Sequence, residues 1–128
     1  VLCCRPPDNR FPTDMEIIEA CLCWIRSVIE IVRPKVVVAI GGKAHEYLRG
    51  SDISITRACG IVEDWTMDLP TGEMTVRYIP TLHPSVCMRP GNPESTNPVM
   101  SLDIKGKKTL LLKHLMIAKR EADRCQVT

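Results

Sequence analysis

The sequence predicts an α/β fold with a central, mostly parallel sheet. Three observations predict it: an apolar pattern of helical period that stops at Pro34, a continuous apolar run over residues 36–40 followed by two glycines, and a strand-like pattern over residues 74–82. A helix, a buried strand, a tight turn and a second helix are the parts of βαβ units. With 128 residues, we expect one domain spanning 1–128.

The first helix follows a proline-rich loop. Pro6 and Pro7 exclude regular structure near the start of the chain, because proline fixes φ and lacks a backbone donor. Thr13, with an acidic residue three positions later, matches a capping box. The helix should end before Pro34, since the residue preceding a proline avoids helical geometry. Its apolar stripe comprises Ile17, Cys21, Ile25, Val28 and Val32.

A strand and a second helix come next. Residues 36–40 form a short apolar run of the kind that is buried on both faces of a parallel sheet. Gly41 and Gly42 make the turn, and the helix should stop at Gly50. Such a turn can hold phosphate at a helix N-terminus, but the spaced glycines and the Gly-Lys-Ser/Thr ending of nucleotide sites are missing. We favour a plain turn and keep a nucleotide-binding domain as an alternative.

The second half predicts a hairpin or loop, a strand and a long helix. The hairpin or loop falls at residues 69–73, the strand at 74–82 and the helix at about 107–123. The expected core stripe of the last helix is Leu111, Leu112, Leu115 and Ala118.

Charge is concentrated at the C-terminal end. The net charge is +2, yet residues 105–124 hold seven basic and two acidic side chains. A basic helix can follow nucleic-acid phosphates or can simply be a solvated surface, and both readings stay open. The few aromatic residues argue against a stacking platform for single strands.

Seven cysteines are too many, and odd in number, for a typical secreted disulfide scaffold. Free thiols or metal ligands in a reducing compartment fit better, so we expect a cytoplasmic protein. No apolar run approaches the roughly 20 residues of a membrane helix, and we expect no signal peptide. Cys4 on the loop and Cys21 on the first helix can be brought together, although their spacing is not that of a zinc knuckle. Buried cysteines that only fill space are the alternative.

The string "LHPSVCMR" places His83 directly after a strand. In open α/β sheets, ligands bind beyond the carboxyl ends of the strands. A histidine there can donate a hydrogen bond to a developing oxyanion. It can equally be a turn residue bonded to backbone, and position alone does not decide between the two.

Several strings occur together in order: "CRPPDNR", "PTDMEIIEAC", "VRPKVVVAIGGKA", "ITRACG", "IPTLHPS" and "SLDIKG". From residue 1 to about residue 107 the chain resembles the iron–sulfur uracil-DNA glycosylases of family 4. The resemblance implies the three-layer glycosylase fold, with its N-terminal part missing from this chain. The family's first catalytic loop and a Cys-x-x-Cys pair would precede Val1.

The resemblance also implies roles for individual residues. Cys4 and Cys21 match two of the four ligands of a [4Fe–4S] cluster. His83 matches the residue that stabilises the departing uracil anion. Pro84, Ser85 and Arg89 match the loop that enters DNA, where Arg89 would contact phosphate.

We therefore expect a DNA glycosylase that hydrolyses the N-glycosidic bond of deoxyuridine in base excision repair. Its partner would be uracil-containing DNA, and we expect a monomer. The 128-residue chain alone should be inactive, because the first catalytic loop is absent from it. The alternative is a DNA-binding or scaffold module of a larger replication or repair protein that kept the fold and lost catalysis.

Overall fold

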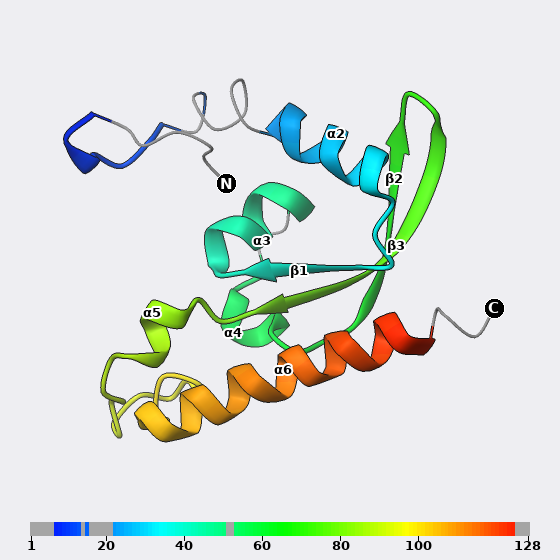
Figure 1. Ribbon diagram of the computed structural model, residues 1–128. Helices are drawn as coiled ribbons and strands as arrows, with labels where there is room; N and C mark the ends of the chain where they lie inside the picture. Colours follow the sequence, from blue (N-terminus) through cyan, green and yellow to red (C-terminus); the bar gives the residue numbers. More distant parts are fainter. Residues whose placement is uncertain (1–6, 14, 16–21, 51–52, 125–128) are drawn as a thin grey trace.

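A mixed three-stranded sheet organises the protein (Figure 1). The computed structural model describes residues 7–13, 15, 22–50 and 53–124. The strand order is β1-β3-β2, with bounds β1 Val36–Ile40, β2 Glu63–Leu69 and β3 Gly72–Thr81. The helices are η1 Pro7–Asn9, α2 Cys23–Val32, α3 Gly42–Arg49, α4 Ile55–Ala58, α5 Pro84–Cys87 and α6 Ile104–Arg124.

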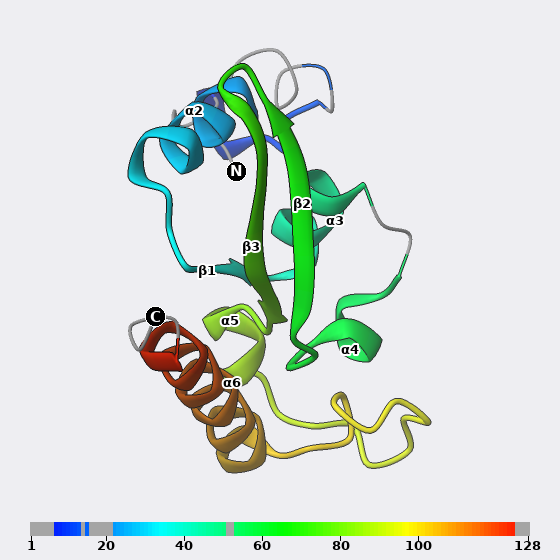
Figure 2. The ribbon, with the colours of Figure 1, turned by 90° about the vertical axis from the view of Figure 1, so that its right-hand side faces the viewer.

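The α/β class is confirmed, but the sheet is mixed rather than mostly parallel across the described strands. β1 runs parallel to β3, with Ile40 opposite Thr81. β2 runs antiparallel to β3, with Leu69 opposite Gly72. A tight two-residue connection can only reverse the chain, so the predicted hairpin itself imposes the antiparallel pair. Figure 2 shows β2 and β3 as one long twisted hairpin.

Helices lie on both sides of the β1–β3 pair: α3 on one side and α6 on the other (Figure 1). The core on the side of α2 and α3 is built mainly from alternate residues of β2 and β3. This alternation is typical of an antiparallel hairpin with one buried face. The buried members of this core are Ile29, Ala39, Trp65, Met67, Leu69, Val76 and Tyr78.

The boundaries around β1 follow the sequence prediction. The first helix ends with Arg33 in the left-handed region, where its N–H donates to the carbonyl of Ile29, directly before Pro34. α3 stops at Gly50, also left-handed. The start predicted at Thr13 runs into residues outside the described ranges, and α2 begins at Cys23 among the described residues.

Burial of β1 differs from the prediction. Ala39 is buried, the three valines are half-buried and Ile40 is exposed. β1 is therefore less buried than expected, although α3 and α6 lie on its two sides. The physical reason is position: β1 pairs only with β3 and forms an edge of the described sheet.

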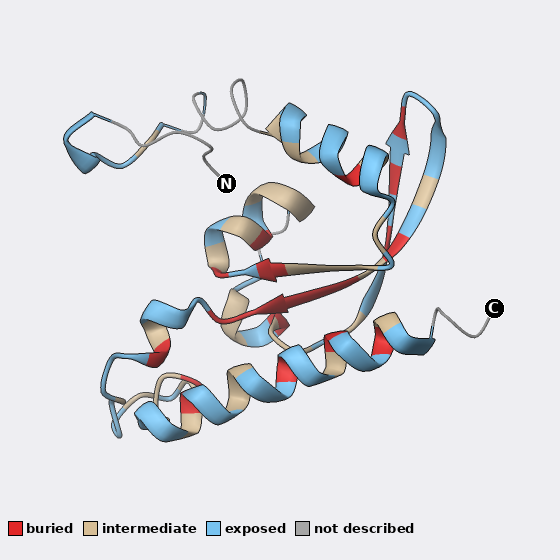
Figure 3. Ribbon diagram, viewed as in Figure 1, coloured by how far each residue is buried: buried red, intermediate tan, exposed pale blue. Residues whose placement is uncertain are grey.

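The buried face of α6 also differs from the prediction. Lys107, His114, Ala118 and Glu121 are buried, whereas Leu112 and Leu115 are exposed. Figure 3 shows α6 with buried positions spaced along an otherwise largely exposed helix. Hydrogen bonds between polar side chains of α6 and β3 hold this face against the sheet. His114 Nδ1 lies 2.9 Å from Thr81 Oγ1, and Arg77 Nε donates to Glu121 Oε2 at 3.1 Å. Of the predicted stripe Leu111, Leu112, Leu115 and Ala118, only Ala118 is fully buried. None of the described helices has the length and apolarity needed to cross a membrane.

Candidate active site

The two parallel strands end side by side, and the segments that follow them meet. Gly41 follows β1, and its N–H donates to the carbonyl of Thr81, the last residue of β3, at 2.8 Å. A Cβ added to Gly41 would lie 3.2 Å from His83 Cβ. Gly41 also has a φ of +94°, which side chains disfavour. Glycine is therefore what allows the β1–α3 turn to approach His83.

His83 is exposed and caps α5. The backbone N–H of Ser85 donates to His83 Nδ1 at 3.1 Å, and Ser85 Oγ lies 2.8 Å from the same nitrogen. A nitrogen that accepts from a backbone N–H carries no proton, so the neutral ring has its proton on Nε2. The site thus offers one oriented donor, Nε2–H, at the carboxyl edge of the parallel strands.

The predicted DNA-binding residues stand close to this histidine. Pro84 is the first residue of α5, a position that suits its missing N–H. Ser85 orients the His83 ring. Arg89 lies two residues beyond the end of α5 and is exposed; its backbone N–H donates to the carbonyl of Val86 at 3.3 Å. The four residues all lie within residues 83–89 of the chain, and their roles toward DNA remain predictions.

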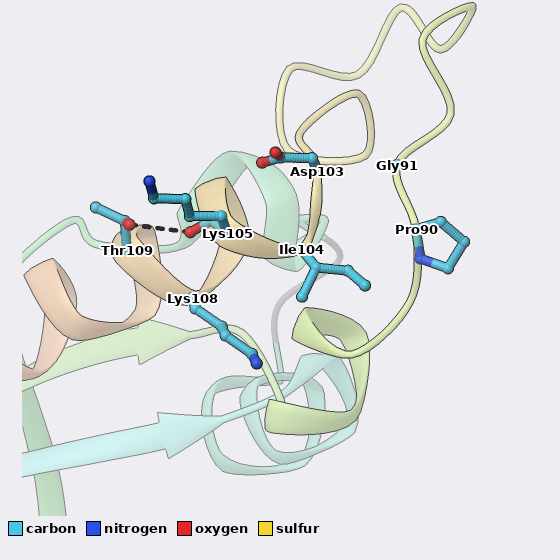
Figure 4. Close-up of a pocket in the computed structure, with 7 residues that line it drawn as sticks. All are labelled: Pro90, Gly91, Asp103, Ile104, Lys105, Lys108 and Thr109. Carbon is cyan, nitrogen blue, oxygen red and sulfur yellow. Dashed lines mark hydrogen bonds between the residues drawn. The ribbon is translucent and has the colours of Figure 1, made fainter.

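A groove opens beyond Arg89 (Figure 4). It has a volume of about 770 Å³ and lies between the loop after α5 and the first turns of α6. Lys105 and Lys108 are exposed along it, and Asp103 caps α6 by accepting from the N–H of Gly106 at 2.7 Å. The lining residues are Pro90, Gly91, Asp103, Ile104, Lys105, Lys108 and Thr109.

The other two histidines are buried. His45 is 4% exposed, with Nδ1 2.8 Å from the hydroxyl of Tyr78, and His114 is 5% exposed against Thr81. Burial lowers the pKa of both imidazoles, because the interior disfavours the charged form. Burial likewise raises the pKa of the Tyr78 phenol. Among the three histidines, all of which lie within the described residues, only His83 is exposed.

Sequence reasoning missed the contact between Gly41 and His83. The sequence pattern does not relate the glycine turn to the histidine, whereas parallel strands that end together bring both to one edge. The turn itself is the predicted strand-to-helix connection between β1 and α3. Sequence reasoning also missed Lys107, which is 2% exposed. Lysine is almost never fully buried, so no sequence signal marked it.

The proposed cluster ligands Cys4 and Cys21 lie outside the described residues. Among the cysteines within the described ranges, Cys23 is exposed, Cys59 half-buried and Cys87 buried. Burial raises the pKa of the Cys59 thiol, which makes it a weak nucleophile and ligand at neutral pH. Residues 7–13, 15, 22–50 and 53–124 form no group of three or more His, Cys, Asp or Glu side chains that could hold a metal ion. The cluster stays a prediction.

Comparison with known proteins decides the family. The profile of the uracil DNA glycosylase superfamily matches residues 1–100. This chain belongs to that superfamily. It is 38% identical to the type-4 uracil-DNA glycosylase of Thermotoga maritima over 114 residues, which cover 88% of this chain and 55% of that protein.

A second superfamily relative, the type-4 uracil-DNA glycosylase of Sulfurisphaera tokodaii, is 33% identical over 92 residues, covering 69% of this chain and 40% of the relative. That of Archaeoglobus fulgidus is 42% identical over 48 residues, covering 38% and 24%. The chain spans about half the length, or less, of these curated relatives. The resemblance seen in the sequence strings is confirmed.

Proposed function

We propose that this protein is a uracil-DNA glycosylase in which His83 stabilises the uracil anion as it departs. The observation that carries the proposal is the hydrogen bond from the Ser85 N–H to His83 Nδ1, which leaves Nε2–H as a fixed donor. The superfamily match and the type-4 relatives support a DNA substrate and a hydrolytic reaction. Acting on DNA as a monomer, the protein would work inside the cell.

The chemistry accounts for the arrangement. A base stacked in a duplex must be flipped out before its glycosidic bond can be attacked. Hydrolysis places negative charge on the pyrimidine ring, and a preorganised donor that stabilises this charge lowers the activation barrier. In this proposal His83 supplies the donor, Ser85 fixes the ring, Pro84 begins the segment that enters the DNA, and Arg89 holds a phosphate.

The remaining half of the relatives' length would supply the other catalytic groups. We infer that the 128-residue chain alone excises uracil negligibly. The complete domain would have three layers, with further strands beyond β1. The half-buried valines of β1 and the placement of α3 and α6 on opposite sides support this arrangement.

A [4Fe–4S] cluster bound in part by Cys4 and Cys21 would be structural in this proposal, joining the N-terminal loop to the first helix. No step of the reaction depends on it here. Protein prepared anaerobically from the complete gene should be brown and should bleach with dithionite. Cys4→Ser should be colourless, with Cys23→Ser as the matched control, and unchanged iron in Cys4→Ser would refute the assignment.

A DNA-binding module without catalysis is the second candidate. The exposed lysines of α6 near the groove favour it, because phosphate contacts alone support binding. The two candidates predict different results with the same substrate: both bind a uracil-containing duplex, and only the glycosylase leaves abasic sites.

The deciding experiment measures abasic sites in a uracil-containing oligonucleotide, using protein expressed from the complete gene. His83→Ala should lower the rate about 100- to 1,000-fold, the range seen when one oxyanion donor is removed. Asp68→Ala, at an exposed position on β2 outside the His83 segment, is the matched control and should stay near the unmodified rate. Excision that is indifferent to His83→Ala would overturn the proposal.

A further inference from the structure

A buried lysine ties the loop after α5 to the first turn of α6. Lys107 is 2% exposed, and its Nζ donates to the backbone carbonyls of Arg89 at 3.2 Å and Pro90 at 3.4 Å. An ammonium group removed from water needs such acceptors. Because both acceptors are backbone atoms, the contact constrains the path of the loop itself.

Two further contacts hold the same loop. The Cys87 thiol donates to the carbonyl of Lys107 at 3.6 Å, so α5 and α6 are joined just before the loop begins. At its far end, Gly91 passes so close to the carbonyl of Leu102 that a Cβ would collide with it. The loop is therefore anchored before, within and after the Arg89–Pro90 peptide.

We propose that Lys107 is a positioning residue for DNA binding: it fixes the Arg89 loop relative to His83 without touching DNA. The inference rests on the proposed function, since it concerns the same site. A loop that is already ordered loses less conformational entropy on binding, and the affinity for DNA is higher as a result. Without the ammonium group, the Arg89 and Pro90 carbonyls would turn to water and the loop would sample other paths.

The test is the affinity of the chain for a uracil-containing duplex at several salt concentrations. Lys107→Met should weaken binding about tenfold, as expected when hydrogen bonds from a charged group are lost. The slope of log affinity against log salt should not change, because Lys107 contacts no phosphate. Arg89→Met should lower the magnitude of that slope by about 0.9, the value for one phosphate contact. Lys113→Met, an exposed lysine on the same helix, is the matched control for the lost charge and should bind like the unmodified chain.

Two further measurements separate positioning from general stability. Gly91→Ala displaces the same loop without altering Lys107, so it should reproduce the weaker binding and the unchanged slope. In the free protein, Lys107→Met should speed amide exchange over residues 88–92 and leave β3 as slow as before.

Wild-type affinity in Lys107→Met, a slope reduced as in Arg89→Met, or unchanged exchange at residues 88–92 would each overturn the inference. If Lys107→Met does not fold, wild-type affinity in Gly91→Ala overturns it. Failure of the unmodified chain to bind the duplex would count instead against the proposed function, and the exchange measurement would still decide whether Lys107 orders the loop.

Discussion

Two regions of the molecule each pack a histidine against a left-handed glycine, with opposite results. At the carboxyl edge, Gly41 approaches His83, and the ring stays exposed with Nε2 as its donor. Under α6, Gly60 approaches His114, whose ring is buried and bonded to Thr81. At the sheet edge, where no described helix covers the ring, the histidine is available for chemistry. Under α6, where the helix covers the sheet, the histidine stabilises the packing of the helix.

The largest expected effect is at the buried pair. A Cβ at Gly60, where φ is +81°, would lie 2.5 Å from His114 Nε2, so Gly60→Ala must displace a packed ring in addition to straining the backbone. We expect a loss of about 2–4 kcal/mol in the free energy of unfolding. Urea denaturation measures it. Gly50→Ala is the control, because φ there is +58° with nothing within 4 Å. Equal losses in the two variants would contradict this account.

Gly41→Ala should have an intermediate effect on stability and a specific effect on the site. Its Cβ would meet His83 Cβ at 3.2 Å, and because rotation of a side chain does not move its Cβ, one of the two backbone segments must shift by a few tenths of an ångström. We expect a loss of about 1–2 kcal/mol, most of it backbone strain. His83 should shift, and the nuclear magnetic resonance signals of its ring should report the shift. Unmoved His83 signals would show that the two segments are not in contact.

Acidification should lower the stability of the protein through its two buried histidines. Burial lowers the folded-state pKa of His45 and His114 below the ordinary 6.5, so the unfolded chain binds protons more readily. Their contribution to stability is complete above pH 6.5 and is lost as pH falls below it, by at most about 1.4 kcal/mol per pH unit for each histidine. Melting temperatures between pH 7.5 and 5 test this. The double variant His45→Gln and His114→Gln should flatten the dependence, and a melting temperature that rises on acidification would refute it.

The smallest expected effect concerns the orientation of the His83 ring. Ser85→Ala removes the hydroxyl at 2.8 Å but keeps the backbone donor at 3.1 Å, so stability should change by less than about 0.5 kcal/mol. The imidazole nitrogen shifts should still show the proton on Nε2. Ser85→Pro removes both donors and should let the proton distribute over both nitrogens. A proton found on Nδ1 in the unmodified protein would remove the basis for His83 as an oriented donor.

Local patterns predicted the elements that local chemistry controls. The apolar run at residues 36–40 became β1 with those bounds, because a short β-branched run between a proline and two glycines has few alternatives. Gly50 ended α3 as predicted, since it adopts a left-handed conformation that other residues disfavour. The sequence predicts His83 as a candidate because it directly follows a strand, and this prediction does not depend on the direction of the neighbouring strands.

Patterns were a poorer guide where packing partners decide. The apolar stripe of α6 predicted leucines inward, yet the buried face carries Lys107, His114 and Glu121. His114 and Glu121 bond to β3, and Lys107 bonds to the loop after α5. Of the hairpin or loop expected at residues 69–73, the structure has the hairpin, and its antiparallel pair makes the sheet mixed across the described strands rather than mostly parallel.

The sequence by itself determined the α/β class, the glycine turns, the histidine after the strand and, through the strings from "CRPPDNR" to "SLDIKG", the superfamily. These depend on backbone preferences and on short motifs, which act within a few residues. Only the tertiary structure decided that Gly41 touches His83 and that Lys107 holds the Arg89 loop. Those contacts join residues 42 and 18 positions apart, and they form because two parallel strands end at one edge and a long helix crosses the sheet beside it.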